Sequence, residues 1–209
     1  MKSLVFPEYS DLDSDFRYLP DFLSTDEQNK LFTNLESTEL IPCPSYNNTF
    51  SRYQKWFQKD NQYFCSKWKT KYERWNSFDY LPYILELEDK VKELIKSFGI
   101  SVDINSCLIN KYRTGEDFIQ AHRDSVDSFG EYPVIVIISL GSTRNLNFRR
   151  LKKSSKKYDK GSNRNFSFEL ESGSIFIMSG SSQKYFVHEI PKCDTSEVRY
   201  SFTFREFIL

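Results

Sequence analysis

Residues 165–180, NFSFELESGSIFIMSG, decide the fold class of this 209-residue chain. Apolar side chains alternate with polar ones at Phe166, Phe168 and Leu170, which is the period of a strand with one buried face. A second short run, rich in β-branched and aromatic residues, follows Gly173 and ends at another glycine. Two strands in succession, with no helix between them, argue against a parallel α/β sheet.

The chain after Gly99 has the same texture throughout. Short segments rich in β-branched and aromatic residues recur, and Gly, Ser, Asn and Pro separate them. Many short strands in one block favour a sandwich or barrel. The further segments are SCLINKY (106–112), PVIVIISLG (133–141), RNLNFRR (144–150), KYFVHEI (184–190) and VRYSFTFR (198–205).

The first hundred residues predict helices instead. Ser24 and Glu27 have the spacing of a capping box at the start of residues 24–37. Residues 80–98 carry one apolar stripe and end before Gly99, a usual C-cap. Its polar side is expected to hold the i,i+4 pairs Glu86–Lys90 and Glu88–Lys92. The segment IPCPSYNN (41–48) is expected to be an irregular connector.

Composition excludes several classes of protein. The chain has 29 basic residues (Lys and Arg together) and 29 acidic residues (Asp and Glu together). Its formal net charge is therefore zero and favours no class of partner. The charge is uneven, however, because residues 1–40 are acidic and residues 52–75 are basic. No run of 18 apolar residues and no signal peptide occur, so we expect no membrane span. The four cysteines form no C-x-x-C pair, which favours free thiols in a reducing, intracellular compartment; they are Cys43, Cys65, Cys107 and Cys193.

The chain has only two histidines, and both are candidate metal ligands. His122 and Asp124 form an H-x-D triplet that would point to one side of a strand, and His188 lies on a later strand. Two histidines and one carboxylate, with open positions opposite, form the facial triad of non-haem Fe(II) oxygenases. Taken singly, each signal is weak, since an H-x-D triplet is common and most strand-end histidines are packed or solvated.

The last strand predicts a site for a dicarboxylic oxoacid. Arg199 and Arg205 are an even number of residues apart and so share one face, and the guanidinium fork matches a carboxylate. Asn110 and Tyr112 share a face of an earlier strand and would hydrogen-bond the same ligand. Without the histidines, two solvated arginines on an edge strand would be the simpler interpretation.

Four collinear motifs in residues 105–205 resemble the AlkB family of 2-oxoglutarate- and Fe(II)-dependent dioxygenases, which repair nucleic acid by oxidative dealkylation of bases. They are LINKYRTGEDFIQAHRD (108–124), ISLGSTRNLNFRR (138–150), SGSIFIMSGSSQKYFVHEIP (172–191) and VRYSFTFR (198–205).

The resemblance implies a site and a fold. His122, Asp124 and His188 would bind Fe(II). The groups expected to hold 2-oxoglutarate, with O₂ completing the reaction, are Asn110, Tyr112, Arg199, Ser201 and Arg205.

The implied fold is a double-stranded β-helix (jelly roll). We therefore predict one α+β domain over residues 1–209, mainly β. Residues 1–100 would form helical support with a substrate lid at about 45–80, and residues 101–209 the catalytic core.

Two positions depart from the family pattern. Val126 stands where the family usually has an acid near the target base, and Asp127 follows it. Ser201 replaces an asparagine of the last strand, which shortens a hydrogen-bonding side chain. The first departure puts the choice of base in question.

The substrate side is predicted from composition. Residues 51–75 contain all three tryptophans interleaved with seven basic residues, a pattern typical of single-strand nucleic-acid platforms. The alternative is a hairpin whose aromatics only cover the core. The substrate candidates are Arg52, Tyr53, Trp56 and Tyr72 from this stretch, with Asp127 and Arg144 from later motifs.

We therefore expect a monomeric oxygenase that removes methyl groups from bases such as 1-methyladenine or 3-methylcytosine in DNA or RNA. A 2-oxoglutarate oxygenase acting on protein or a small molecule is one alternative. An inactive nucleic-acid-binding module is another, although such a module has no need of three metal ligands and two arginines.

Overall fold

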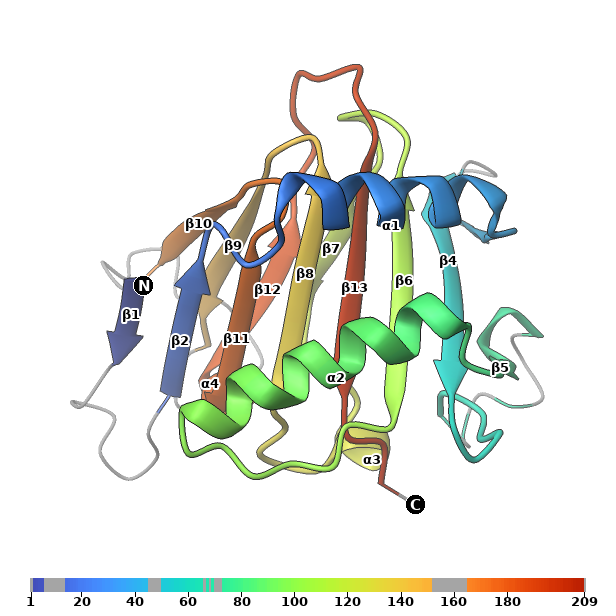
Figure 1. Cartoon of the computed structure of the whole chain (residues 1–209). Helices are drawn as coiled ribbons and strands as arrows, with labels where there is room; N and C mark the ends of the chain where they lie inside the picture. Colours follow the sequence, from blue (N-terminus) through green and yellow to red (C-terminus); the bar gives the residue numbers. More distant parts are fainter. Residues whose placement is uncertain are drawn as a thin grey trace.

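The computed structural model describes residues 2–5, 14–44, 50–65, 67, 69, 73–151 and 165–208. Its core is two facing β-sheets, and two helices cross the outer face of the larger sheet (Figure 1). The larger sheet has the order β1 (Lys2–Val5), β2 (Ser14–Leu19), β11 (Ile175–Gly180), β8 (Ile135–Gly141), β13 (Arg199–Arg205), β6 (Ser106–Tyr112), β4 (Phe50–Gln58) and β3 (Ile41–Pro44), with β5 (Ser77–Phe78) beside β4. The smaller sheet has the order β10 (Phe166–Leu170), β9 (Arg144–Arg150), β12 (Phe186–Ile190) and β7 (Ile119–His122). Within the described residues the strands pair antiparallel except for the short parallel β4–β5 pair, and this arrangement confirms the predicted jelly roll.

The two long helices begin and end where the sequence predicts. In α1 (Thr25–Ser37), Ser24 and Glu27 form the reciprocal capping box. Helix α2 (Pro82–Ser97) ends before Gly99, whose φ of 73° is the left-handed conformation that glycine adopts most easily. The described residues also form short helices: η3 (Glu73–Trp75), α3 (Val126–Phe129) and α4 (Ser182–Tyr185).

Because side chains alternate along its strands, the larger sheet has one apolar face and one polar face. On β13, Tyr200, Phe202 and Phe204 pack with the apolar stripe of α2 in one core cluster. The intervening side chains therefore point into the space between the sheets. They are Arg199, Ser201, Thr203 and Arg205.

A second core fills one end of the space between the sheets. Phe16 on β2 makes edge contacts with Phe148 on β9 and Phe186 on β12, with ring centroids 4.9 and 5.6 Å apart. This aromatic packing fixes the spacing of the two sheets, so the functional side chains at the other end are held on rigid walls.

The interpretation of residues 1–100 as helical support was incomplete, because strands from this region extend both sides of the larger sheet. β4 escaped prediction because its inner face carries Arg52, Gln54 and Gln58, which hide the usual apolar alternation. Residues 41–44 are also a strand, β3, and not an irregular connector. Its prolines are tolerated because β3 lies at the sheet edge.

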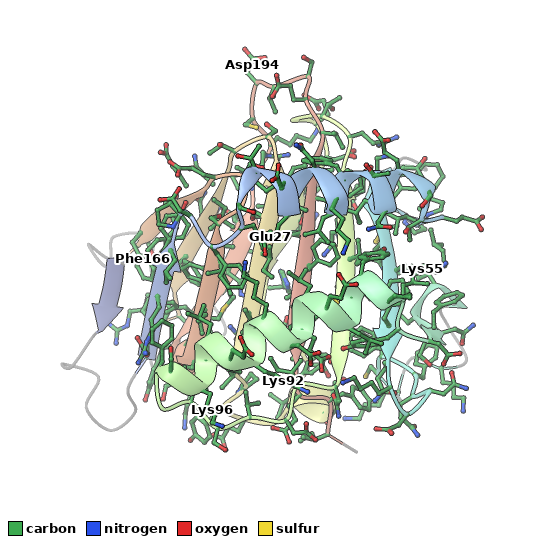
Figure 2. All side chains as sticks on the ribbon, in the orientation of Figure 1. Glu27, Lys55, Lys92, Lys96, Phe166 and Asp194 are labelled. Atoms are coloured by element: carbon green, nitrogen blue, oxygen red, sulfur yellow. The ribbon has the colours of Figure 1, made fainter. Side chains whose placement is uncertain are left out.

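Of the two i,i+4 pairs expected on α2, the structure confirms Glu88–Lys92, at 2.7 Å, but not Glu86–Lys90. Glu88 itself is only 1% exposed and also binds Lys59, at 2.5 Å. Glu86 pairs with Lys30 of α1, and Lys90 pairs with Glu27, so these pairs join the two helices. Figure 2 shows Glu27 on α1 and Lys92 on α2.

Replacing Glu27 with alanine should lower the free energy of unfolding at pH 7 by about 1 kcal/mol, the usual value of a helix cap. Its carboxylate accepts from the Ser24 N–H and from Lys90, and these contacts lower its pKa to about 2. The stabilisation is present above the unfolded pKa and is lost as the pH falls through about 2. Urea unfolding at pH 7, 4.5 and 2.5 should show the difference in free energy of unfolding between wild type and Glu27→Ala becoming smaller as the pH falls. A Glu36→Ala control, exposed on the same helix, should show neither effect.

The structure bears out the expectation of free thiols, because all four cysteines are unpaired. Within the described part of the chain, no helix is both long and apolar enough to cross a bilayer.

Candidate metal centre and co-substrate cavity

The smaller sheet brings the two histidines together. His122 ends β7 and lies directly opposite His188 of β12, with ring centroids 4.3 Å apart. Asp124 follows two residues after the strand, and His122 Nε2 lies 3.8 Å from its Oδ1. One potential ligand atom from each of the three residues lies within 4.8 Å of the others. This is the spacing of donors around one metal ion.

Hydrogen bonds fix the orientation of these donors. His122 Nδ1 lies 2.8 Å from the carbonyl oxygen of Gln120, which leaves Nε2 facing the other two donors. Arg205 Nε donates to Asp124 Oδ2 at 2.5 Å, and the Asp124 backbone N–H donates to Gln183 Oε1 at 3.0 Å. Such supporting contacts are typical of metal ligands.

Electrostatics favour the protonation states that bind metal. Desolvation lowers the pKa of His122, although Asp124 opposes the shift. Desolvation and the neighbouring His122 lower the pKa of His188 to about 3. Burial disfavours the Asp124 anion, but Arg205 and the histidines outweigh it, so the pKa of Asp124 lies below its usual value. At neutral pH the group is two neutral imidazoles and one carboxylate, the states in which these side chains coordinate metals.

A cavity of about 150 Å³ adjoins the three donors, and β13 and β6 form its floor. Arg199 is buried there, and its Nη2 donates to Ser139 Oγ at 2.7 Å. Its Nε and Nη1 have no partner within the described residues. Burial lowers the pKa of Arg199, Tyr112 opposes this shift and the neighbouring Arg144 adds to it, and the described residues provide no carboxylate partner. A carboxylate of 2-oxoglutarate would give this buried cation an anionic partner and could accept from one of its unpartnered donors, so the cavity fits this co-substrate.

The other predicted co-substrate residues share this cavity. Asn110, Tyr112, Ser201 and Arg205 all line it. Asn110 pairs with Ser201, and Tyr112 pairs with Arg199, in the β6–β13 ladder. Adjacent strands therefore present these side chains side by side.

The substrate candidates of residues 51–75 separate. Arg52 lines the cavity, and its Nε donates to Asn110 Oδ1 at 2.8 Å. Trp56 does not line it, because it is fully buried against Phe64, with ring centroids 4.9 Å apart, and its Nε1 donates to the Gln62 carbonyl. Tyr53 points to the other face of β4, where Arg113 lies 5.1 Å from its ring centre. Tyr72 lies outside the described residues, as does Trp68.

The two later candidates also do not line the cavity. Asp127 pairs with Lys67 at 2.6 Å and faces a separate polar hollow of about 410 Å³. Arg144 is a brace: its guanidinium donates to the carbonyl oxygens of Thr114, Asp117 and Pro191. The sequence alone does not show whether the donors of a buried arginine are already used in hydrogen bonds within the protein or are available to a ligand.

Sequence reasoning missed several lining residues. Phe64 and Trp75 stack at 4.1 Å with an interplanar angle of 25° and form an aromatic wall. Arg123 and Ser125, on either side of Asp124, also line the cavity. The basic aromatic composition of residues 51–75 pointed to the wall region, but no signal distinguished Trp75 from Trp56.

Comparisons with known proteins agree with this geometry. Residues 15–205 match the family model of the 2OG-Fe(II) oxygenase superfamily. The mouse (Mus musculus) alpha-ketoglutarate-dependent dioxygenase alkB homolog 3 is 30% identical over 127 residues, covering 60% of this chain and 43% of the mouse protein. The Arabidopsis thaliana DNA oxidative demethylase ALKBH2 is 28% identical over 144 residues, covering 62% and 45% respectively. The chain therefore matches less than half the length of these relatives.

Solved structures share the fold. That of OsALKBH1 superimposes with a TM-score of 0.63 at 17% identity, covering 91% of this chain and 97% of that one. A prolyl hydroxylase from Trichoplax adhaerens gives a TM-score of 0.59 at 14% identity, covering 92% and 83%. The chain belongs to the 2OG-Fe(II) oxygenase superfamily, whose cofactors are Fe(II), 2-oxoglutarate and O₂.

Proposed function

We propose that this chain oxidatively demethylates N-methylated bases in nucleic acid, using Fe(II) and 2-oxoglutarate. The observation that carries this proposal is the convergence of two features on one cavity. The three metal donors form one wall, and the two free donors of Arg199 lie in the same cavity. The AlkB-type relatives supply the substrate class.

Each residue has a role in this proposal. His122, Asp124 and His188 hold Fe(II), and Arg205 keeps the Asp124 carboxylate oriented. Arg199 binds the distal carboxylate of 2-oxoglutarate. The other oxygens of 2-oxoglutarate lie among Asn110, Tyr112, Ser201 and Arg205. With O₂, the bound iron and 2-oxoglutarate supply the oxidant that hydroxylates the N-methyl carbon, and formaldehyde, succinate and CO₂ are released.

The aromatic wall gives the target base a place to stack. Trp75 backs onto Phe64, and both line the cavity that contains His122. A base flipped out of its strand would lie against this wall with its methyl group toward the metal donors. Arg52 and Ser125 lie in the same lining and can donate to its polar edge.

The direct test is release of succinate and formaldehyde from methylated oligonucleotides by the purified protein with Fe(II), 2-oxoglutarate and ascorbate. The panel should include 1-methyladenine and 3-methylcytosine in single- and double-stranded DNA and RNA. No turnover on any oligonucleotide would contradict the proposal. Oligonucleotide binding without turnover would favour a binding module, and turnover on peptides or small molecules alone would favour the other oxygenase class.

Gln183 should act as a positioning residue for the metal ligand Asp124. The paired backbone of β7 ends at His122, so the Asp124 N–H depends on Gln183 Oε1. The amide cannot turn freely, because its Nε2 donates to Met178 Sδ at 3.1 Å. Loss of such a supporting contact typically lowers metal affinity by about 10- to 100-fold.

We therefore expect Gln183→Leu to weaken Co(II) binding by about tenfold or more, measured from the visible absorption of the Co(II)–2-oxoglutarate complex. Gln183→Glu retains an acceptor and should bind better than the leucine variant. Gln28→Leu is the control, because the Gln28 side chain also hydrogen-bonds the backbone, donating to the Leu23 carbonyl, but Gln28 belongs to α1 and does not contact the metal donors. If Gln183→Leu lowered only the melting temperature, the positioning role would be wrong.

A further inference from the structure

The cavity carries an excess of buried positive charge. Four arginines line it, and three of them are largely buried: Arg52 at 7%, Arg199 at 1% and Arg205 at 4% exposure. Among the described lining residues, Asp124 is the one carboxylate, and it pairs with Arg205. The charges of Fe(II) and of doubly ionised 2-oxoglutarate cancel each other. Asp124 offsets one of the three buried arginines, so the loaded site retains the positive charge of the other two.

Arg52 contributes a charge that no neighbouring anion neutralises. Its three guanidinium nitrogens donate to uncharged acceptors: Asn110 Oδ1 at 2.8 Å, Gln54 Oε1 at 3.1 Å and Ser51 Oγ at 3.4 Å. Its position is therefore fixed by hydrogen bonds, and its charge remains directed at the cavity.

The nearby acids cannot neutralise this excess. Asp127 is paired with Lys67 and faces the separate hollow. Asp117 is bound by Arg113. At the cavity mouth, Arg123 adds another exposed cation for which the described residues provide no carboxylate. A base entering the cavity thus meets cations and the aromatic side chains of Phe64 and Trp75.

We propose that this site prefers methylated bases without a positive charge over cationic ones. This inference rests on the proposed demethylase function. Bases such as 1-methylguanine and 3-methylthymine are neutral at pH 7, whereas 1-methyladenine and 3-methylcytosine are cations. Two like charges about 8 Å apart in an effective dielectric of about 20 change an equilibrium by a factor of about ten or more.

The test uses four oligonucleotides that differ only in the methylated base, two neutral and two cationic. At saturating 2-oxoglutarate, wild-type kcat/KM should be at least about tenfold higher for the neutral pair. Arg52→Gln removes the charge and should reduce this ratio by about tenfold. Ser125→Asp adds a carboxylate to the lining and should shift the ratio in the same direction.

Lys55→Gln is the matched control, because Lys55 lies on the same strand but faces the other way. Its ammonium is 4.2 Å from the Phe78 ring centre, and Figure 2 shows it at the β4 side of the molecule. The ratio should not change in this variant. Because the ratio compares substrates within one protein, any general loss of 2-oxoglutarate binding cancels.

The outcomes separate the two proposals. Absence of turnover on all four bases would contradict the demethylase function itself. Turnover with equal or higher kcat/KM on the cationic bases would overturn the charge preference and leave the function intact. A preference for neutral bases that neither Arg52→Gln nor Ser125→Asp alters would also overturn it, because its cause would lie elsewhere.

Discussion

Replacing His188 with alanine is expected to abolish 2-oxoglutarate turnover and to leave oligonucleotide binding nearly unchanged. In the proposed site His188 is one of three metal donors, and the two remaining donors would hold Fe(II) poorly. Loss of a residue that merely supports a ligand costs about 10- to 100-fold, so loss of the ligand itself should lower kcat/KM by more than about a hundredfold. Because His188 is only 5% exposed, it does not reach a backbone phosphate.

Three measurements check this prediction. Succinate release should fall to the rate measured without added iron, and Co(II) titration should lose its visible absorption bands. Fluorescence anisotropy with a labelled methylated oligonucleotide should give a Kd within about twofold of wild type, since the phosphate contacts that dominate nucleic-acid affinity are untouched. If oligonucleotide binding collapsed as well, metal coordination and nucleic-acid recognition would not be separable as proposed.

The sequence predicted those strands that bury apolar side chains on one face or on both faces, because such strands show a recognisable apolar pattern. β13 alternates aromatic and polar residues because one face meets α2 and the other meets the cavity, so its period is visible. β4 has the same two environments, but its inner face is Arg52, Gln54 and Gln58, while Lys55 interrupts its outer face. A strand whose inward residues are polar for function loses the pattern by which strands are recognised.

The metal donors were predictable for a different reason. Only two histidines occur in the chain, so the pairing of His122 with His188 required no choice among alternatives. Trp56 and Trp75 did require a choice, and composition cannot make it. Both are buried in the same aromatic cluster, yet only Trp75 reaches the cavity, because its position depends on how the segment from Gln58 to Ser77 folds back onto β4.

Arg144 and Arg199 show the same limit for charged residues. Both are almost fully buried, and both lie over the ring of Tyr112, with guanidinium carbons 5.5 and 5.1 Å from its centre. Arg144 donates to three backbone carbonyls and leaves its Nε without a described partner, whereas Arg199 makes one hydrogen bond and leaves both Nε and Nη1 without one. Only the hydrogen-bond geometry distinguishes a structural arginine from one that awaits a ligand.

This difference gives the second large effect, which is expected at Arg199. Arg199→Lys keeps the charge but loses the planar fork, so at least one charge-assisted hydrogen bond to 2-oxoglutarate is lost. Such a bond contributes about 1.5–3 kcal/mol, which corresponds to about a 10- to 100-fold increase in the KM for 2-oxoglutarate. The kcat at saturating 2-oxoglutarate should stay close to wild type, because Arg199 is distant from the metal donors along β13. Steady-state kinetics with varied 2-oxoglutarate measures both quantities.

Arg199→Met removes the charge altogether. We expect it to leave the stability of the ligand-free protein unimpaired, whereas Arg144→Met should destabilise the protein. Without 2-oxoglutarate, the buried charge of Arg199 has no anionic partner, so its removal should not lower the melting temperature of the ligand-free protein. Arg144→Met leaves buried carbonyls without donors and should lower the free energy of unfolding by about 2 kcal/mol or more. At 2-oxoglutarate concentrations 100 times its Kd, the wild-type protein should gain about 2.7 kcal/mol, and Arg199→Met should gain none. A ligand-free Arg199→Met protein as unstable as Arg144→Met, or one still stabilised by 2-oxoglutarate, would show that Arg199 braces the sheet and does not bind the co-substrate.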